Sequence, residues 1–457
     1  MKKFDAIVVG AGQAGPALAH VLGDMGQKVA VAEENLVGGS CVNYGCTPSK
    51  TLIGSARAIY AASRGEEFGF STGKLTVNFE RVMQRQHDIV TAMRGRDEKG
   101  LFAMKGVTYY HARASFISKT EMQVGDEVLK AKHIYLNVGA RAVIPKIPGL
   151  DSVPYLDNQT IFDLKELPRH FIMLGGGYIS MEFAHAFRRF GSEVTVIESG
   201  GQVLNREDED VAICAQEILE KEGVKFLLNH KAIQIEKRGS TIVVHVETKG
   251  KKRSEVVGTH LLVAVGRQPN SDTLKVENAG IKLDEKGHIQ VDNHLKTNVD
   301  GIYALGEVNG RGAFTHTTYN DYEIAADNLK GGKRKVSDRI PTYGVFIDPP
   351  IAHIGMNEKE VRESGTKALI GKMQMSKVNR ATEFGQEEGF MKVLVDAKTQ
   401  RFLGATLIGL NADEVIHSIT DLMYARKPYT VMQNAVHIHP TVSELLPTVL
   451  GMLEPLK

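Results

Sequence analysis

Two cysteines that stand close together are the clearest sign of chemistry in the sequence. Cys41 and Cys46 follow a Gly-Gly pair and precede Pro48-Ser49-Lys50, whereas the third and last cysteine of the 457-residue chain, Cys214, lies far away. A chain with so few cysteines does not depend on structural disulfides, so a close pair is more typical of a catalytic disulfide or a metal site. Metal binding is disfavoured because there is no second cysteine pair and no nearby histidine at ligand spacing. The sequence therefore predicts a redox-active disulfide and no metal.

A segment near the C-terminus could supply the proton transfer that thiol–disulfide exchange needs. It reads His437-Ile438-His439-Pro440-Thr441-Val442-Ser443-Glu444. Imidazole can take up and return a proton near neutral pH because its ordinary pKa is about 6.5. We expect a helix to begin at Pro440, which places His439 just outside it. Glu444 would lie about one turn inside that helix, where its carboxylate could orient the ring.

The first candidate nucleotide site lies at the start of the chain. An apolar strand over residues 4–9 is followed by Gly10-Ala11-Gly12-Gln13-Ala14-Gly15, a predicted helix through Leu22, and a strand over 28–32 that ends at Glu33. Glycines in this arrangement let backbone N–H groups and a helix N-terminus approach a pyrophosphate, and the acidic residue binds ribose hydroxyls. The candidate cofactor-binding residues here are Gly10, Gly12, Gly15 and Glu33.

The same pattern recurs in the middle of the chain. A strand over 171–174 precedes Gly175-Gly176-Gly177-Tyr178-Ile179-Ser180, and a helix over 181–190 leads to a strand over 193–197 that ends at Glu198. Gly175, Gly177 and Glu198 are the candidate residues, and Ser180 replaces the third glycine, which is expected to loosen the packing slightly. A carboxylate at this place accepts from a free 2′-hydroxyl and repels a 2′-phosphate, so we expect NADH to be preferred over NADPH.

Two dinucleotide-binding folds in one chain indicate a flavin and a nicotinamide used in series, with the flavin in the fold that carries the cysteines. The motifs together resemble the pyridine nucleotide-disulfide oxidoreductases, a flavoprotein family that includes dihydrolipoamide dehydrogenase, glutathione reductase and mercuric reductase. The resemblance extends from about residue 4 to about residue 451, through the segments GAGQAG, GGSCVNYGC, GGGYIS, VAVGRQPN, TNVDGIYALGE and HIHPTVSE. It implies an α/β fold with two Rossmann-like domains, for FAD and NAD, and a C-terminal α+β dimerisation domain.

The resemblance also implies catalytic roles. Cys46 would face the flavin, and Cys41 would attack the substrate. His439, rather than His437, would be the acid–base residue, with Glu444 as its partner. In the family this histidine acts on the disulfide of the other subunit, which implies an obligate homodimer.

Further cofactor positions follow from the same resemblance. Lys50 would lie near the flavin ring and pair with Glu182. Two segments depart from the family pattern, because Asn137-Val138-Gly139 replaces Ala-Thr-Gly and Glu307 replaces an aspartate that hydrogen-bonds the ribityl chain. We expect FAD to bind, with an altered fit at Glu307. The remaining implied positions are Gly139, Gly266 and Gly306.

The order of the motifs predicts the domain organisation. We expect a FAD-binding domain over 1–150 that resumes over 271–335, an inserted NAD-binding domain over 151–270 and an interface domain over 340–457. Predicted strands of the interface sheet cover 343–352 and 390–396, and an amphipathic helix covers 81–95. Cys214, in a predicted helix over 208–221, is interpreted as a small core residue.

The composition gives no sign of a nucleic-acid-binding or a membrane protein. The chain is 42% hydrophobic and 24% charged, with a formal net charge of +2. These values give no reason to expect a nucleic acid or a membrane as partner. No apolar run reaches the roughly 18 residues typical of a membrane-spanning helix. The N-terminus enters a strand without a signal-peptide pattern, so we expect a cytoplasmic enzyme.

The sequence narrows the class of substrate but does not identify the substrate. The chain ends without the extra C-terminal cysteine pair that mercuric reductase needs, and Glu198 disfavours the NADPH-linked reduction of glutathione. The leading hypothesis is an NAD-linked oxidoreductase of the dihydrolipoamide dehydrogenase type that acts on a lipoyl-type or other small disulfide. The alternatives are a mercuric-reductase-like or different disulfide reductase, a flavin transhydrogenase, and a redox-sensing protein.

Overall fold

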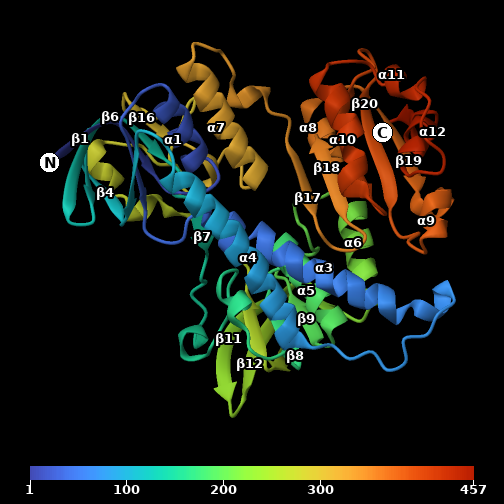
Figure 1. Ribbon diagram of the computed structural model, residues 1–457. Coiled ribbons are helices and arrows are strands. Elements are labelled where there is room, and N and C mark those ends of the chain that lie inside the picture. The colour runs from blue at the N-terminus through green and yellow to red at the C-terminus, as the bar shows by residue number, and fades with distance from the viewer.

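A largely parallel sheet near the N-terminus holds the first glycine-rich turn. The structure is a computed structural model that describes residues 1–457 (Figure 1). The sheet has the order β3-β2-β1-β6-β5-β4, with β16 paired to β6. Residues 6–9 of β1 are buried, as expected for a strand covered on both faces. The strands are β1 Lys2–Val9, β2 Val29–Glu33, β3 Val107–His111, β4 Ala114–Ser118, β5 Glu121–Val124, β6 Glu127–Leu136 and β16 Ile302–Ala304.

The turn after β1 requires glycine. Gly10 has a φ of 101°, and a Cβ atom there would collide with the carbonyl oxygen of Asn137. Helix α1 (Gly15–Asp24) begins directly after this turn and packs with α7 (Thr315–Leu329) against the sheet. The N-terminus of α1 therefore lies at the carboxyl end of β1, where a phosphate group can be bound.

A second parallel sheet carries the second glycine-rich turn. Its order is β10-β9-β8-β14, and a separate antiparallel sheet has the order β11-β12-β13. Both lie at the lower part of Figure 1, with helix α5 beside them. The elements are β8 His170–Leu174, α5 Tyr178–Phe190, β9 Glu193–Ile197, α6 Glu209–Lys221, β10 Lys225–Leu227, β11 His230–Arg238, β12 Thr241–Thr248, β13 Arg253–Gly258 and β14 His260–Val263. The predicted α/β fold with two Rossmann-like units is confirmed.

The two places where the chain passes between these units lie side by side. Strand β7 (Ala140–Ala142) runs antiparallel to β15 (Arg267–Pro269). The outgoing and returning segments are thus joined by backbone hydrogen bonds, which connect the end of the first sheet to the end of the second.

The C-terminal part of the chain forms a mixed lobe around one sheet, which we call the interface lobe. The sheet has the order β17-β18-β21-β20-β19-β22. A single strand was predicted over 343–352, and this is wrong: β17 and β18 are separated by a turn that contains Asp348-Pro349-Pro350, where prolines remove the N–H groups that a continuous strand needs. The elements are β17 Thr342–Val345, β18 Ile351–Gly355, α8 Glu358–Ser364, β19 Ala368–Gln374, α9 Asn379–Glu383, β20 Phe390–Asp396, β21 Phe402–Ile408, α10 Ala412–Tyr424, α11 Thr430–Gln433, α12 Leu446–Leu450 and β22 Glu454–Pro455.

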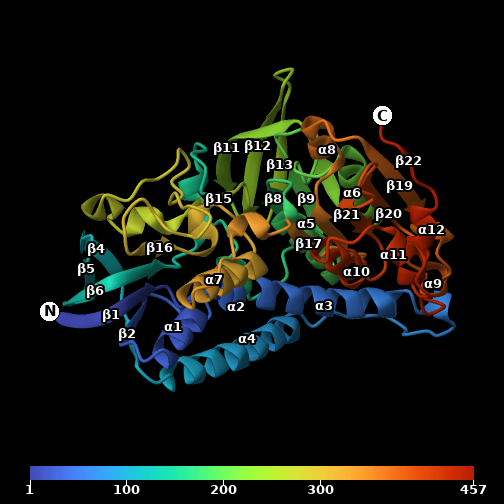
Figure 2. The same cartoon turned by 90° about the horizontal axis from the view of Figure 1, so that it is seen from above.

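Two long helices cross the molecule between its lobes. Helix α3 (Cys46–Ser63) and helix α4 (Phe79–Phe102) extend away from the first sheet, as Figure 2 shows from above. The buried side chains of α3, such as Leu52, pack with the phenylalanines of α5 in one hydrophobic core. Helix α4 is longer than the predicted range of 81–95. The long α3 therefore connects the cysteines at its start to both other parts of the protein.

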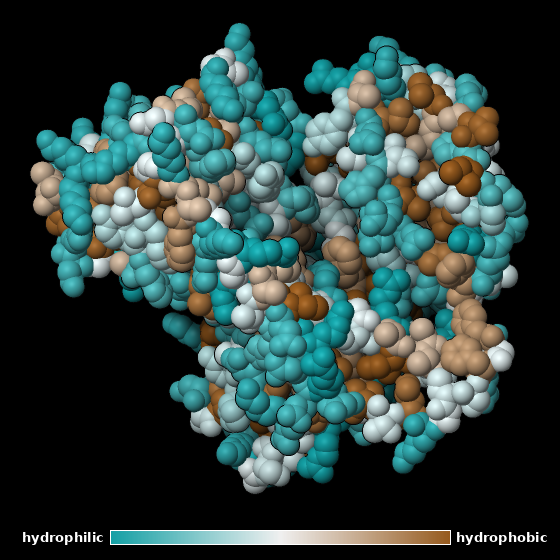
Figure 3. All heavy atoms as spheres, viewed as in Figure 1, coloured by the Kyte–Doolittle hydropathy of each residue, from teal (hydrophilic) through white to brown (hydrophobic).

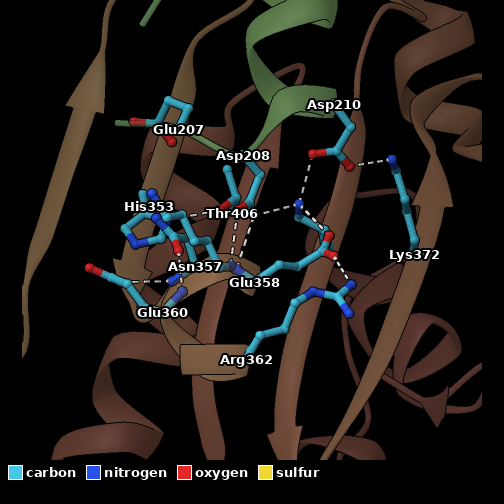
Figure 4. A network of polar contacts seen from close by, with 12 residues as sticks. Glu207, Asp208, Asp210, His353, Asn357, Glu358, Glu360, Arg362, Lys372 and Thr406 are labelled. Carbon is cyan, nitrogen blue, oxygen red and sulfur yellow. Dashed lines mark hydrogen bonds and ion pairs between the residues drawn. The ribbon is translucent and has the colours of Figure 1, made fainter. Parts of the chain in front are cut away.

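A buried ammonium group joins the second Rossmann-like unit to the interface lobe. Lys392, on β20, is 1% exposed, and its Nζ lies 2.8 Å from carboxylate oxygens of Asp208, Asp210 and Glu358. The two aspartates stand at the start of α6, and Glu358 begins α8 (Figure 4). Because three carboxylates converge on one cation, this cluster fixes α6 against the interface sheet.

The interface lobe exposes several large hydrophobic side chains. Figure 3 shows brown residues on this lobe at the upper right. Among the exposed apolar side chains are Val431, Val436, Ile438 and Met452. Such exposure is typical of a surface that meets another protein chain. None of the helices has the length and apolar character needed to cross a membrane.

Candidate functional site

The two cysteines lie at the junction of two helices. Cys41 is in α2 (Gly39–Tyr44), and Cys46 is the first residue of α3. Gly45 separates the helices, and a Cβ atom on it would lie 2.8 Å from the carbonyl oxygen of Ser40. A larger residue could not keep the two helices this close. The structure therefore places both sulfurs together at an N-terminus of an 18-residue helix, as thiol chemistry requires.

The surroundings of the two sulfurs differ in their electrostatic effect. The hydrogen bond from Cys41, followed by one from Thr315 and the positive charge of Lys50, lowers the pKa of Cys46 to about 6. The same contact with Cys46, together with burial, raises the pKa of Cys41. Cys46 is thus the thiol that favours the anion, and Cys41 is the one that keeps a proton.

A buried carboxylate holds the lysine close to Cys46. The Nζ of Lys50 lies 2.8 Å from Oε2 of Glu182, which is 4% exposed. The other oxygen of Glu182 accepts a hydrogen bond from the backbone N–H of Phe346 at 3.0 Å, and Lys50 also lies over the Phe346 ring. The predicted pairing of Lys50 and Glu182 is present, and it connects α3, α5 and the loop after β17.

One large cavity joins the cysteines to the first glycine-rich turn. Its volume is about 690 Å³, within the range of cofactor sites in proteins. Both cysteines and several predicted cofactor residues line it, and these are Gly10, Gly12, Glu33, Cys41, Cys46, Lys50, Gly139, Glu182 and Glu307. Glu33 ends β2 and accepts hydrogen bonds from the N–H groups of Ala11 and Asn35, each at 2.8 Å. The cavity therefore has the size and the dinucleotide turn that a FAD site needs.

Asn137 explains one departure from the family pattern. Its Oδ1 accepts from the backbone N–H of Gly15 at 3.0 Å, and its Nδ2 donates to the carbonyl oxygen of Leu305 at 3.1 Å. The side chain thus ties the first glycine-rich turn to the second flavin segment. Gly139, which follows, has a φ of 63° and faces open space at its missing Cβ.

At the second departure, Glu307 forms an ion pair with Arg267 that was not predicted from the sequence. The guanidinium of Arg267 donates to both carboxylate oxygens of Glu307, at 2.6 and 2.9 Å, and also to the carbonyl oxygen of Ala140. The longer side chain of glutamate lets this pair form across the junction of the two units. The adjacent Gly306 donates its N–H to the buried carboxylate of Asp321 at 2.8 Å.

The second turn is arranged for a nicotinamide dinucleotide. Gly175 has a φ of 97°, Gly177 precedes α5, and Gly266 has a φ of 148° on the neighbouring return segment. Glu198 accepts from the backbone N–H groups of Gly176 and Gly200, each at 2.6 Å, which fixes its carboxylate at the end of β9. Ser180 is fully buried in α5, so this substitution for glycine is accommodated within the packed interior.

Tyr178, the first residue of α5, directly follows the second glycine-rich turn. It lines the cavity, and its ring centroid lies 5.9 Å from that of Phe314. Burial raises its pKa to about 12. The cavity that holds the cysteines is therefore lined here by a neutral aromatic side chain from the start of α5.

The predicted contact between His439 and Glu444 is present, although the expected helix does not form it. Nδ1 of His439 lies 3.0 Å from both carboxylate oxygens of Glu444. The expected helix start at Pro440 is wrong, because a 3₁₀ turn begins only at Ser443 and α12 follows it. The contact forms because the chain between the two residues turns back, with Thr441 also donating its N–H to Glu444. The Nε2 of His439 points away from this pair, and the side chain is 69% exposed.

His439 makes no hydrogen bond or ion pair with either cysteine of its own chain. The sequence pattern therefore predicted the His–Glu pair, but one chain does not bring it to the sulfurs. His437 is partly buried, and its Nδ1 forms a hydrogen bond with the carbonyl oxygen of Ala435.

Three residues of the site were missed from the sequence: Tyr178, Arg267 and Thr315. Tyr178 and Arg267 stand inside the segments GGGYIS and VAVGRQPN, so their motifs offered a signal. Thr315 begins α7, and its Oγ1 lies 3.2 Å from the sulfur of Cys46. It carries no motif signal, because only the fold brings it to the cysteines from 269 residues away.

Comparisons with known proteins agree with this geometry. Residues 4–325 match the family model of the pyridine nucleotide-disulphide oxidoreductases, and residues 341–450 match that of their dimerisation domain. The chain is 36% identical over 456 residues to the probable pyridine nucleotide-disulfide oxidoreductase RclA of Escherichia coli K12, covering 98% of both chains. It is 30% identical over 446 residues to dihydrolipoyl dehydrogenase of Geobacillus stearothermophilus, covering 96% of this chain and 94% of the relative.

A solved structure supports the same conclusion. The Cu(II) complex of the HOCl-induced flavoprotein disulfide reductase RclA from Escherichia coli matches with a TM-score of 0.90 at 35% identity, over 99% of both chains. The chain therefore belongs to the pyridine nucleotide-disulfide oxidoreductase family.

Proposed function

We propose that the protein passes electrons from NADH through FAD to the Cys41–Cys46 disulfide and on to a small disulfide substrate. As a member of its family the chain is a flavoprotein disulfide oxidoreductase that uses FAD and NAD(P)H. The observation that carries the finer proposal is that a thiol with a pKa lowered to about 6, Cys46, lines the same cavity as the dinucleotide turn. FAD, when bound there, supplies two-electron transfer between the nicotinamide and the disulfide.

Residues of the chain itself bind the cofactor, stabilise charge and transfer protons in this proposal. Gly10, Gly12, Gly15 and Glu33 hold the dinucleotide, and Lys50 places a positive charge near Cys46. Reduction breaks the sulfur–sulfur bond, so Cys46 keeps the negative charge and Cys41 takes up a proton. Cys41 then attacks the substrate disulfide once it loses that proton to a base. His439, oriented by Glu444, is the base in this proposal.

We also propose a homodimer in which each His439 serves the cysteines of the other copy. This is supported by the exposed side chain of His439, by the neighbouring exposed Val436 and Ile438, and by the match to a dimerisation domain. The proposed division of the chain assigns 1–150 and 271–335 to FAD, 151–270 to NAD and 340–457 to the interface. We also propose a cytoplasmic location, because a chain with only three cysteines lacks the set of structural disulfides that an oxidising compartment favours.

The substrate class is the finer part of the proposal. Dihydrolipoyl-type disulfides are the first candidates because relatives at 29–30% identity include dihydrolipoyl dehydrogenases. Reduction of a thiol-bound metal ion is a second candidate, since one similar solved structure is a Cu(II) complex and another relative is a mercuric reductase.

An anaerobic titration with NADH tests the proposal. We expect a long-wavelength absorbance, from the Cys46 thiolate against the oxidised flavin, to appear after two electrons are added. A panel of lipoamide, glutathione disulfide, Cu(II) and Hg(II) then identifies the acceptor by steady-state NADH consumption. Cys41→Ser should abolish turnover with disulfides, and full activity in this variant would exclude the disulfide mechanism and favour a transhydrogenase.

A further inference from the structure

Thr315 brings a hydroxyl group to the two sulfurs from a distant part of the chain. It is the first residue of α7, and its Oγ1 lies 3.2 Å from Sγ of Cys46. The hydrogen bond that Thr315 forms with a cysteine goes to Cys46, and none joins it to Cys41. A hydroxyl can donate to a thiolate, so Thr315 can stabilise negative charge on the sulfur that it contacts.

The start of α7 is held firmly in place around Thr315. The ring of Phe314 is stacked between His316, at 5.5 Å, and Tyr343, at 5.6 Å between ring centroids. Thr317 closes the turn, because it accepts from the N–H of Phe314 and donates to the carbonyl oxygen of the same residue. A hydroxyl on this fixed turn loses little additional freedom when it bonds to a sulfur.

The charged and titratable groups near Cys46 leave a place for such a donor. From α3 comes Lys50, whose ammonium is already paired with the buried Glu182 of α5. Tyr178 of α5 lines the same cavity as Cys46, and its phenol is neutral at ordinary pH because its pKa is raised. Because the lysine's charge is largely balanced by Glu182, Thr315 is the one uncommitted side-chain donor that reaches Cys46 from α7.

We propose that Thr315 is a catalytic residue whose hydroxyl donates a hydrogen bond to Cys46 in the reduced protein, which keeps the negative charge on Cys46 and the proton on Cys41. The inference rests on the roles of the two cysteines given under the proposed function. When the sulfur–sulfur bond breaks, two electrons from NADH enter the pair and one proton is bound. Thr315 determines which sulfur carries the remaining charge, and so which thiol the base must activate before it can attack substrate.

The test is the pH at which the thiolate absorbance of the two-electron-reduced protein is half lost, compared in four proteins. The pKa of Cys46 places this midpoint near pH 6 in the unsubstituted protein, with the absorbance lost as the pH falls. Thr315→Val keeps the shape but removes the donor, and we expect the midpoint to rise by about one pH unit or more. Thr315→Ser restores the donor and should return the midpoint to within a few tenths of a unit.

Thr51→Val is the matched control. Thr51 lies in α3 soon after Cys46, but its hydroxyl bonds to the carbonyl oxygen of Thr47 at 2.8 Å, so its loss should leave the midpoint unchanged. An unchanged midpoint in Thr315→Val overturns the inference, and so does an equal shift in Thr51→Val. Failure of the unsubstituted protein to show the absorbance would instead contradict the proposed function itself.

A second measurement detects negative charge on Cys41. Without the Thr315 donor, more of the thiolate should reside on Cys41, so alkylation of the reduced protein by iodoacetamide at pH 7 should shift toward Cys41. Peptide mass spectrometry measures the ratio of the two modified cysteines. If Thr315→Val does not fold, Thr315→Ala against Thr315→Ser gives the same comparison, and an identical Cys41-to-Cys46 ratio in the two variants would refute the inference.

Discussion

At the scale of single residues, the site gives two neighbouring thiols opposite properties. Cys46 receives hydrogen bonds and lies near a lysine, which lowers its pKa to about 6. Cys41 donates to Cys46 and is partly buried, which raises its pKa. An enzyme that must leave charge beside its cofactor and protonate the outer sulfur needs this difference, because only the thiolate is nucleophilic.

The role of His439 as the base can be tested separately from the reduction of the protein by NADH. His439→Gln keeps a polar side chain but cannot accept a proton, so turnover with disulfides should fall by about 10²-fold or more. Reduction by NADH, followed in a stopped-flow instrument, should keep nearly its full rate because no proton passes through His439 in that step. His437→Gln is the control, and it should leave both rates unchanged; near-normal disulfide turnover in His439→Gln would remove it from the mechanism.

We predict that one side chain, Glu198, determines the preference for NADH over NADPH. Glu198 is held by two backbone N–H groups, so its charge stays fixed where a 2′-phosphate would lie. Glu198→Gln removes the charge but keeps the size, and we expect kcat/KM for NADPH relative to NADH to rise about tenfold or more. Glu193→Gln, at the exposed other end of β9, should not change the ratio. A preference for NADPH in the unsubstituted protein would contradict the interpretation of Glu198.

At the scale of elements, the junction of α2 and α3 sets the distance between the sulfurs. Gly45→Ala would place a methyl group 2.8 Å from the carbonyl oxygen of Ser40, so the two helices must separate. We expect less thiolate absorbance after reduction and a lower unfolding temperature. Gly54→Ala on the same α3 meets nothing within 4 Å and should be neutral or stabilising by about 0.5–1 kcal/mol. An equal, small effect of both substitutions would show that the junction is not under this constraint.

Elements with a strong local pattern could be predicted from the sequence. The strands Glu193–Ile197 and Phe390–Asp396 have the predicted bounds, because each is a short apolar run between clear turn residues. Both errors in element bounds lie at prolines. The strand predicted over 343–352 is interrupted by its prolines, and the helix expected at Pro440 begins only after a turn. Proline occurs at strand edges as well as at helix starts, so its presence alone does not identify the element at either place.

The site itself was predictable where a motif carries it and unpredictable where only folding does. The glycine turns, the cysteines, Glu33, Glu198 and the His439–Glu444 pair have fixed spacings that reflect local chemistry. Thr315 and Asn137 reach the site through contacts between segments more than a hundred residues apart. No periodicity in one segment encodes such a contact, because it depends on how separate sheets pack together.

At the scale of the whole molecule, the Lys392 cluster fixes the second Rossmann-like unit to the interface lobe. Lys392→Met would leave three carboxylates without their cation, and we expect a loss of about 3–5 kcal/mol in stability. Lys372→Met is the matched control, since Lys372 is on the neighbouring strand, pairs with Asp210 alone and is one-third exposed. That pair should contribute about 0–1 kcal/mol. Thermal unfolding of both variants measures the difference, and equal melting temperatures would argue against a structural role for the cluster.

The exposed position of His439, apart from the cysteines of its own chain, has a consequence for mixtures of damaged proteins. A Cys41→Ser chain and a His439→Gln chain should each be inactive toward disulfides as a pure homodimer. If the two kinds of subunit exchange, each hybrid contains one site with both lesions and one site with neither. Two dead proteins should therefore regain activity on mixing, as complementing alleles do in a diploid cell, whereas a histidine that served its own chain could never be rescued in this way.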